Sequence, residues 1–224
     1  MSYTTFGAEH IASMLIILAV WVIILFWGSK LNQWQIQFVA TLLAVLTITV
    51  EFFDDVYRFQ DGHWLLIRDL PLHMCGFSTF LSAYALYTRS QMSFEFAFFW
   101  GIGGALQAMI TVDLTGINNM IGSFALNWQH SIIILNVLWL IFAYNKRFNL
   151  RGVFNAFIFI NLAIIPVGII NYLLSANYMF ICFPPNVNNP LLIGQWPTYL
   201  IVLEFIYFIY ILILYIPFKL LNKK

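Results

Sequence analysis

Charged side chains are scarce in this chain, and their scarcity excludes most classes of soluble protein. Asp, Glu, Lys and Arg make up 8% of the 224 residues, whereas apolar residues make up 62%. A soluble domain has roughly 25% charged and about 45–50% apolar residues. The formal net charge is only +1, so no concentrated basic face exists to bind nucleic acid. We therefore expect an integral membrane protein whose partners are membrane lipids rather than nucleic acid.

Cysteine is almost absent as well. Cys75 and Cys182 lie far apart, which excludes a disulfide-rich scaffold and every multi-cysteine metal site. A single disulfide between them is geometrically conceivable. Asp54, Asp55 and Asp61 match no regular pattern of metal ligands, so we expect neither a metal nor a cofactor. Strand-length alternation of polar and apolar residues is also missing, which argues against a membrane β-barrel.

Long apolar runs are what the chain has instead. A helix needs about 20 mostly apolar residues to cross the hydrocarbon core of a bilayer. Runs of about that length occupy residues 8–28, 36–53, 70–88, 93–112, 128–145, 152–174 and 197–217. No linker is long enough to separate domains. The expected fold is therefore an all-α membrane protein, a seven-transmembrane helix bundle that forms one domain over residues 1–224.

Basic residues predict the orientation of this bundle, because cytoplasmic loops carry an excess of Lys and Arg. Eight basic residues fall on one side of the predicted spans: Lys30, Arg89, Lys146, Arg147, Arg151, Lys219, Lys223 and Lys224. Arg58 and Arg68 fall on the other side. This asymmetry predicts an N-terminus outside and a C-terminus in the cytoplasm of a multi-pass protein of the cell membrane.

Polar residues inside the predicted spans cluster at one depth, in the outer half of the bundle. Ionisable groups within a bilayer are costly and usually face the bundle interior, so they are functional candidates. The expected substrate-binding residues are His10, Glu51, Gln107, Asn171 and Glu204. The same residues could instead form hydrogen bonds that hold the helices together. Their asymmetric placement favours a polar pocket that opens outward.

His73, Cys75 and His130 are the expected catalytic residues of this layer. His73 and Cys75 follow Pro71 at the start of a hydrophobic helix, where proline is well tolerated. Either histidine could act as a base, a proton donor or a polar contact between helices. Cys75 could be a nucleophile, but a thiol also serves as a small packing residue. The long loop at 175–196 contains three prolines; we expect it to be extended and able to cover the pocket.

Several motifs together resemble the YwaF family of bacterial integral membrane proteins, over nearly the whole chain. They lie at residues 6–10 (FGAEH), 70–75 (LPLHMC), 101–108 (GIGGALQA), 130, 177–180 (NYMF) and 196–199 (WPTY). That family is similar to an animal protein described as a cysteine-dependent acyltransferase of ether phospholipids. The similarity implies a thiol nucleophile activated by histidine. In the animal relative the cysteine directly precedes the histidine, where this chain has Leu72, and Cys75 follows three residues later.

Two functions from different classes therefore remain open. The first is a phospholipid acyltransferase or acyl hydrolase, with His73 or His130 as base and Cys75 as a candidate nucleophile. The second is a transporter or receptor that binds a polar small molecule or a lipid head group without catalysis. Broken helices would favour a transporter, and Pro166 with Gly168 could interrupt the sixth span. A purely structural role would predict no pocket.

Overall fold

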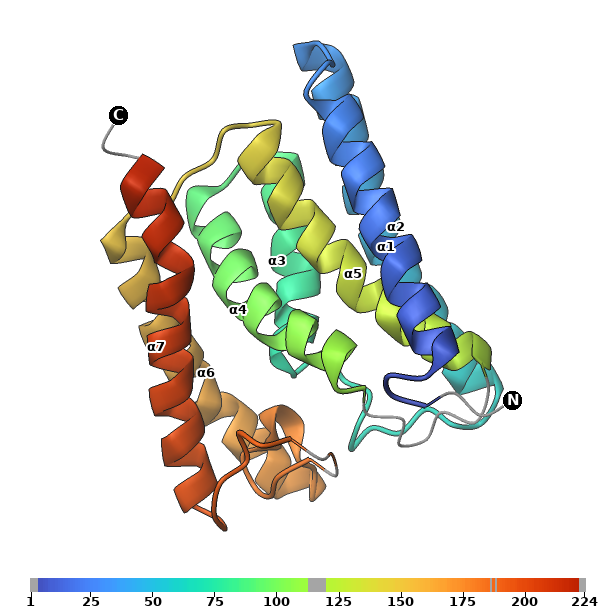
Figure 1. Ribbon diagram of the computed structural model, residues 1–224. Coiled ribbons are helices and arrows are strands. Elements are labelled where there is room, and N and C mark those ends of the chain that lie inside the picture. Colours follow the sequence, from blue (N-terminus) through green and yellow to red (C-terminus); the bar gives the residue numbers. More distant parts are fainter. Residues whose placement is uncertain (1–3, 113–119, 186, 188, 222–224) are drawn as a thin grey trace.

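The computed structural model describes residues 4–112, 120–185, 187 and 189–221, and the side chains of all these except 120–125 and 221. This part of the chain is all-helical, with seven α-helices and one 3-10 turn (Figure 1). The helices are α1 (Ala8–Gly28), α2 (Gln33–Gln60), α3 (Met74–Thr88), α4 (Gln91–Ile110), α5 (Met120–Phe142), α6 (Leu150–Leu174) and α7 (Thr198–Leu221). The 3-10 turn, η1 (Tyr178–Phe180), interrupts the loop that we expected to be wholly extended.

Four of these helices, α1, α2, α6 and α7, are long and apolar enough to cross a membrane. α3 has only 15 residues, or roughly 22 Å of helix at about 1.5 Å per residue, against a hydrocarbon core of about 30 Å. The chain is therefore a helical membrane protein with at least four candidate spans in its described part. Seven crossings remain a prediction.

The start of α3 differs from the predicted span 70–88. Pro71 does not occupy the first turn of the helix; the helix begins at Met74, with His73 as its N-cap in an extended conformation (φ −81°, ψ 159°). The N–H of Leu72 instead donates to the carbonyl of Leu70 at 2.7 Å, in a tight turn before the helix. This turn folds back on the helix, because a Cβ on Gly76 would lie only 2.7–2.8 Å from backbone atoms of Pro71.

α4 lies at the centre of the bundle. It packs against α3 and α5 on one side and against α6 and α7 on the other, while α1 packs on α5 and α2 on α3 and α5 (Figure 1). Its buried aromatic rings Phe94, Phe98 and Phe99 surround Phe148, with ring centroids 4.3–5.2 Å apart. Aromatic and small residues thus join the two groups of helices through α4.

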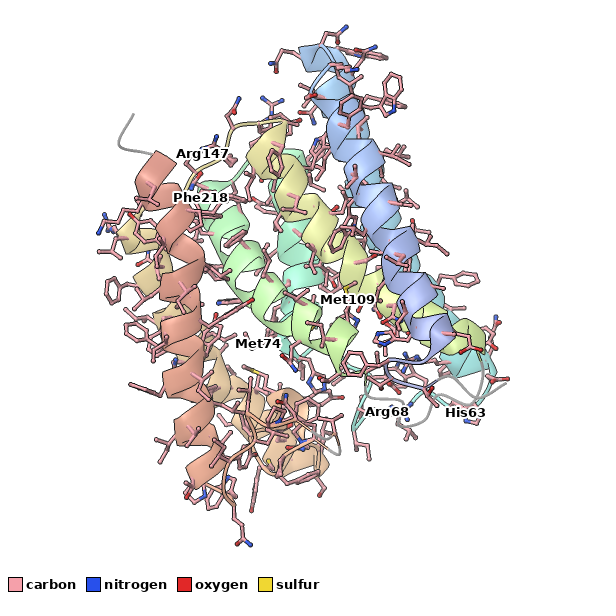
Figure 2. All side chains as sticks on the ribbon, in the orientation of Figure 1. His63, Arg68, Met74, Met109, Arg147 and Phe218 are labelled. Carbon is pink, nitrogen blue, oxygen red and sulfur yellow. The ribbon has the colours of Figure 1, made fainter. Side chains whose placement is uncertain are left out.

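The two ends of the bundle differ in the way the sequence predicts. Figure 2 shows Arg147 and Phe218 at one end, and His63 and Arg68 at the other. The Arg147 end also holds Lys146, whose Nζ donates to the carbonyl of Arg89 at 2.6 Å. The basic residues of the described chain are thus separated by end, but the side that each end faces remains a prediction.

Candidate functional site

His73 is held in place by the loop that follows α6. Its Nδ1 accepts a hydrogen bond of 3.2 Å from the backbone N–H of Met179. Its ring packs against those of Tyr178 and Phe180, at centroid distances of 5.4 and 5.0 Å. A backbone N–H can only donate, so the neutral imidazole carries its proton on Nε2. The Nε2–H of His73 has no hydrogen-bond partner within the described part of the chain.

His130 is held in the opposite state on α5. Its Nδ1 lies 2.7 Å from the carbonyl oxygen of Leu126, one helical turn earlier. Because a carbonyl only accepts, Nδ1 carries the proton and Nε2 keeps a free lone pair in the neutral ring. The two histidines therefore have complementary tautomers, with an Nε2 donor on His73 and an Nε2 acceptor on His130.

Cys75 is the second residue of α3, the helix whose N-cap is His73. A Cβ on Gly104 would approach its Sγ to 3.0 Å, so α3 and α4 are in close contact here. The side chain packs against the apolar cluster of Ala105 and Met109. The charge of Glu51 also acts on the thiol. Cys75 and Cys182 are both free thiols in this structure, so no disulfide joins them here.

Glu51 connects α2 to this group. Its Oε2 accepts a hydrogen bond from the amide of Gln129, which directly precedes His130 on α5. Gln129 is a polar residue that the sequence analysis missed, and its position beside His130 was the available signal. Glu51, His73, Cys75, Gln129 and His130 are hereafter called the α2–α3–α5 group, because these helices supply its members.

The remaining histidine of the predicted layer, His10, joins α1 to the end of α4. Its Nε2 lies 2.8 Å from the carbonyl oxygen of Met109, and its Nδ1 accepts the N–H of Phe6 at 2.9 Å. The ring is 2% exposed. Both nitrogens are thus engaged within the protein, in the neutral state with the proton on Nε2.

The other predicted binding residues lie in three separate places. The amide of Gln107 donates to the hydroxyl of Thr111 at 2.9 Å, within α4 and its C-terminal cap. Glu204 on α7 accepts a hydrogen bond of 3.1 Å from Asn161 on α6. Asn171, at the end of α6, bonds to the backbone of Tyr178 through both polar atoms of its amide. Only Asn171 connects directly to the residues around His73.

An ion-pair cluster leads into the site from the loop before α3. Asp69 accepts hydrogen bonds from Arg68 at 2.8 Å, from the N–H of Leu65 at 2.7 Å and from Arg58 at 3.2 Å. Burial raises the pKa of Asp69, but the bonds from Arg68 and Leu65 and the charge of Arg58 outweigh it, so the pKa lies below its usual range. The cluster fixes the chain four residues before His73.

A small cavity of about 80 Å³ lies between α1, α2 and α5. Its lining is apolar apart from Ser131, and it includes Trp128, Ile132 and Leu135 of α5. These residues lie on the face of α5 roughly opposite to His130, given about 100° of rotation per residue. The cavity is therefore not part of the α2–α3–α5 group. Nor do the described residues contain a set of three His, Cys, Asp or Glu side chains arranged to hold a metal ion.

The fold and the polar groups define a multi-helix integral membrane protein with ionisable residues inside its helical bundle. A model of the TMEM164 family, a membrane protein family, matches residues 5–215, and the chain belongs to that family. No curated protein and no solved structure matches the chain.

Proposed function

We propose that this protein transfers or hydrolyses acyl groups of membrane phospholipids at the α2–α3–α5 group. The observation that carries the proposal is the pair of histidines whose backbone contacts give them complementary roles. His130 has a free Nε2 lone pair, and His73 has a free Nε2–H. A free lone pair suits a general base that takes a proton and later returns it, and a free N–H suits a donor that stabilises an oxygen as it becomes negative.

The resemblance to the YwaF family and its animal acyltransferase relative also supports acyl transfer. In the proposed reaction, His130 Nε2 removes a proton from the nucleophile, which attacks the ester carbonyl of the lipid. His73 Nε2–H donates a hydrogen bond to the oxygen that becomes negative. The acyl–oxygen bond then breaks, and the leaving alcohol takes the proton back from His130. Transfer to a second lipid hydroxyl or to water completes the reaction.

The nucleophile is either the thiol of Cys75 or a hydroxyl group that attacks directly. Leu72, at the position where the animal relative has cysteine, packs in an apolar cluster with Val167 and Tyr178. Cys75 instead faces Gly104 of α4, where an added Cβ would lie 3.0 Å from its Sγ. Cys75, two residues after His73 on the chain, is therefore the thiol that we propose as the candidate nucleophile. Glu51, His10, Gln107 and Glu204 remain proposed head-group residues, whereas both polar atoms of the Asn171 amide are already bonded to the backbone of Tyr178.

The histidine pair is tested by single substitutions. His73→Ala and His130→Ala should each lower acyl transfer about 10²-fold or more, the usual contribution of a general acid or base. The measurement is mass spectrometry of acyl exchange and fatty-acid release in phospholipid vesicles that contain the purified protein. His63→Ala is the matched control, since His63 is an exposed loop residue 3.7 Å from Asp61. Full activity in both site variants would contradict the proposal.

The nucleophile is tested by its own pair of variants. If the thiol attacks, Cys75→Ala abolishes transfer and no acyl-enzyme forms, whereas Cys182→Ala has wild-type activity, because Cys182 is exposed in the loop after η1 and is not a member of the α2–α3–α5 group. The readout is intact-protein mass after a short incubation with lipid, which detects an added acyl group. Retained activity in Cys75→Ala, with loss in His73→Ala, would mean direct attack by water or by a lipid hydroxyl.

The rival function is non-catalytic binding of a polar small molecule or a lipid head group. A transporter of this kind often has a broken helix at its binding site. α6 is continuous from Leu150 to Leu174, with Pro166 inside it. No feature of α6 therefore favours the rival over catalysis. Lipid binding without any turnover in the assay above would favour it.

A further inference from the structure

The loop next to His73 has an unusual backbone. Met179 and Phe180 both have positive φ angles, 57° and 53°, although neither is glycine. For residues with a side chain this conformation is unfavourable. It persists only where the surroundings hold it, and such outliers often lie beside functional groups. Here the strained residues include Met179, whose N–H bonds to His73.

Asn171 and Tyr178 supply the contacts that hold this backbone. Asn171 is 2% exposed; its Nδ2 donates to the carbonyl of Tyr178 at 3.0 Å, and its Oδ1 accepts the Tyr178 N–H at 2.8 Å. Both hydrogen bonds of the Tyr178 main chain therefore go to one side chain. This fixes the peptide that precedes Met179.

The phenol of Tyr178 fixes the other side of the site. Its ring is fully buried, its hydroxyl donates to the carbonyl of Leu66 at 2.6 Å, and the same oxygen accepts the N–H of Leu70 at 3.1 Å. Leu70 is three residues before His73. Tyr178 thus connects the end of α6 to the segment that leads into α3.

We infer that Asn171 and Tyr178 are positioning residues that keep His73 in the neutral state with its proton on Nε2. They do so through Met179. Asn171 fixes the Tyr178 peptide, which precedes Met179. The Tyr178 hydroxyl holds this loop against the segment at 66–70, which leads into His73. Together they aim the Met179 N–H at Nδ1. Without that donor, Nδ1 could carry the proton and the Nε2–H would be lost. The catalytic role of this arrangement rests on the proposed function. The tautomer of His73 rests only on the hydrogen bond from the Met179 N–H.

The experiment reads the tautomer directly, by ¹⁵N NMR of protein labelled only at histidine. The chain has four histidines, and His73→Gln identifies the signals of His73. In the wild type, His73 should show the shifts of an Nε2–H ring and His130 those of an Nδ1–H ring. In Asn171→Ala, the two His73 signals should move toward each other as both tautomers become populated, while those of His130 stay fixed.

Tyr178→Phe is the second variant, since it keeps the buried ring and removes only the two bonds of the hydroxyl. It should produce the same shift of His73. Tyr172→Phe is its matched control, because Tyr172 lies in the last turn of α6, six residues before Tyr178, and is 86% exposed. Unchanged His73 signals in Asn171→Ala or in Tyr178→Phe would overturn the inference.

Activity measurements separate this inference from the proposed function. If both hold, Asn171→Ala and Tyr178→Phe lower kcat by about tenfold or more with little change in KM, since substrate contacts remain. If His73→Ala has full activity while the two variants still shift the His73 signals, the proposed function fails and the positioning role stands.

Discussion

Gly76 is the residue on which the approach of the Pro71 turn to α3 depends. An added Cβ would lie 2.7–2.8 Å from the Cα, C and O of Pro71. These are backbone atoms, so no side-chain rotation can relieve the overlap. The turn that contains Pro71 also sets the position of His73, two residues later. Gly76 therefore contributes both to stability and to the geometry of the candidate site.

Gly76→Ala should lower the stability by about 1–3 kcal/mol, the usual cost of overpacking, and should also lower any acyl transfer. The measurement is the thermal unfolding midpoint of the purified protein in detergent. Gly168→Ala is the control, because its Cβ would meet only Ile181 Cδ1 at 3.6 Å, an ordinary contact. Alanine favours a helix interior over glycine by about 1 kcal/mol, so the control should be unchanged or slightly more stable. Equal midpoints for the two variants would contradict the role of Gly76.

The sequence identifies the chemical types of the site residues but not their contacts. His73 and His130 stand out because ionisable groups are rare in apolar runs. Their tautomers depend on backbone partners, and Met179 is 106 residues away from His73. No local pattern reports a contact of that range. Glu204 shows the same limit, since its partner Asn161 depends on how α6 and α7 are rotated about their axes.

At the scale of elements, the loop at 61–73 is held by charge rather than by helix formation. Asp69 joins Arg58 of α2 to Arg68 of the loop, and the guanidinium of Arg68 also donates to the carbonyl of His63 at 2.6 Å. The segment has no regular structure of its own, so these bonds determine its path to α3. The apolar run predicted a span from residue 70, because hydropathy does not register such a turn.

The stability supplied by Asp69 should depend on pH. Its pKa is lowered in the folded protein, so its contribution is complete above the unfolded pKa of about 3.9 and is lost as the pH falls through the lower folded value. Asp69→Asn should therefore be less stable than the wild type at neutral pH, by roughly 1–3 kcal/mol for bonds to a charged group.

The difference between wild type and Asp69→Asn should shrink as the pH is lowered from about 4 toward 3. Thermal midpoints measured in detergent over this range provide the check. Asp61→Asn is the control, since its carboxylate is 55% exposed and lies 3.7 Å from His63. An Asp69→Asn difference that stays constant with pH would mean that the carboxylate charge does not hold the loop.

At the scale of the whole molecule, His73 and the residues that hold it lie toward one end of the bundle, while other buried polar residues, such as Asn136 and Glu95, lie elsewhere in it. The Asp69 cluster contains Arg68, which marks one end of the bundle in Figure 2, and it leads along the chain to His73 and its contact with the 177–180 loop. Loop lengths and hydropathy are enough to predict this placement toward one end. Loop lengths and hydropathy do not predict that Glu204 bonds to Asn161, at a place separate from the two histidines. The depth of a residue follows from its position along its helix. Whether two side chains meet also depends on how each helix is rotated about its axis.

The end marked by Arg68 should face outward, and thiol labelling of intact cells tests this. Arg58 and Arg68, the two basic residues of that end, are both paired with aspartates, whereas the opposite end carries most of the Lys and Arg. Because cytoplasmic loops are rich in these residues, an impermeant maleimide should label the native Cys182, which is exposed at the outer end. A Cys182→Ser variant should not be labelled.

The control adds Ser29→Cys to the Cys182→Ser variant, at an exposed site in the turn between α1 and α2. This protein should be labelled only after the membrane is permeabilised. Labelling of Ser29→Cys in intact cells, with none of Cys182, would reverse the orientation and put the site on the cytoplasmic face.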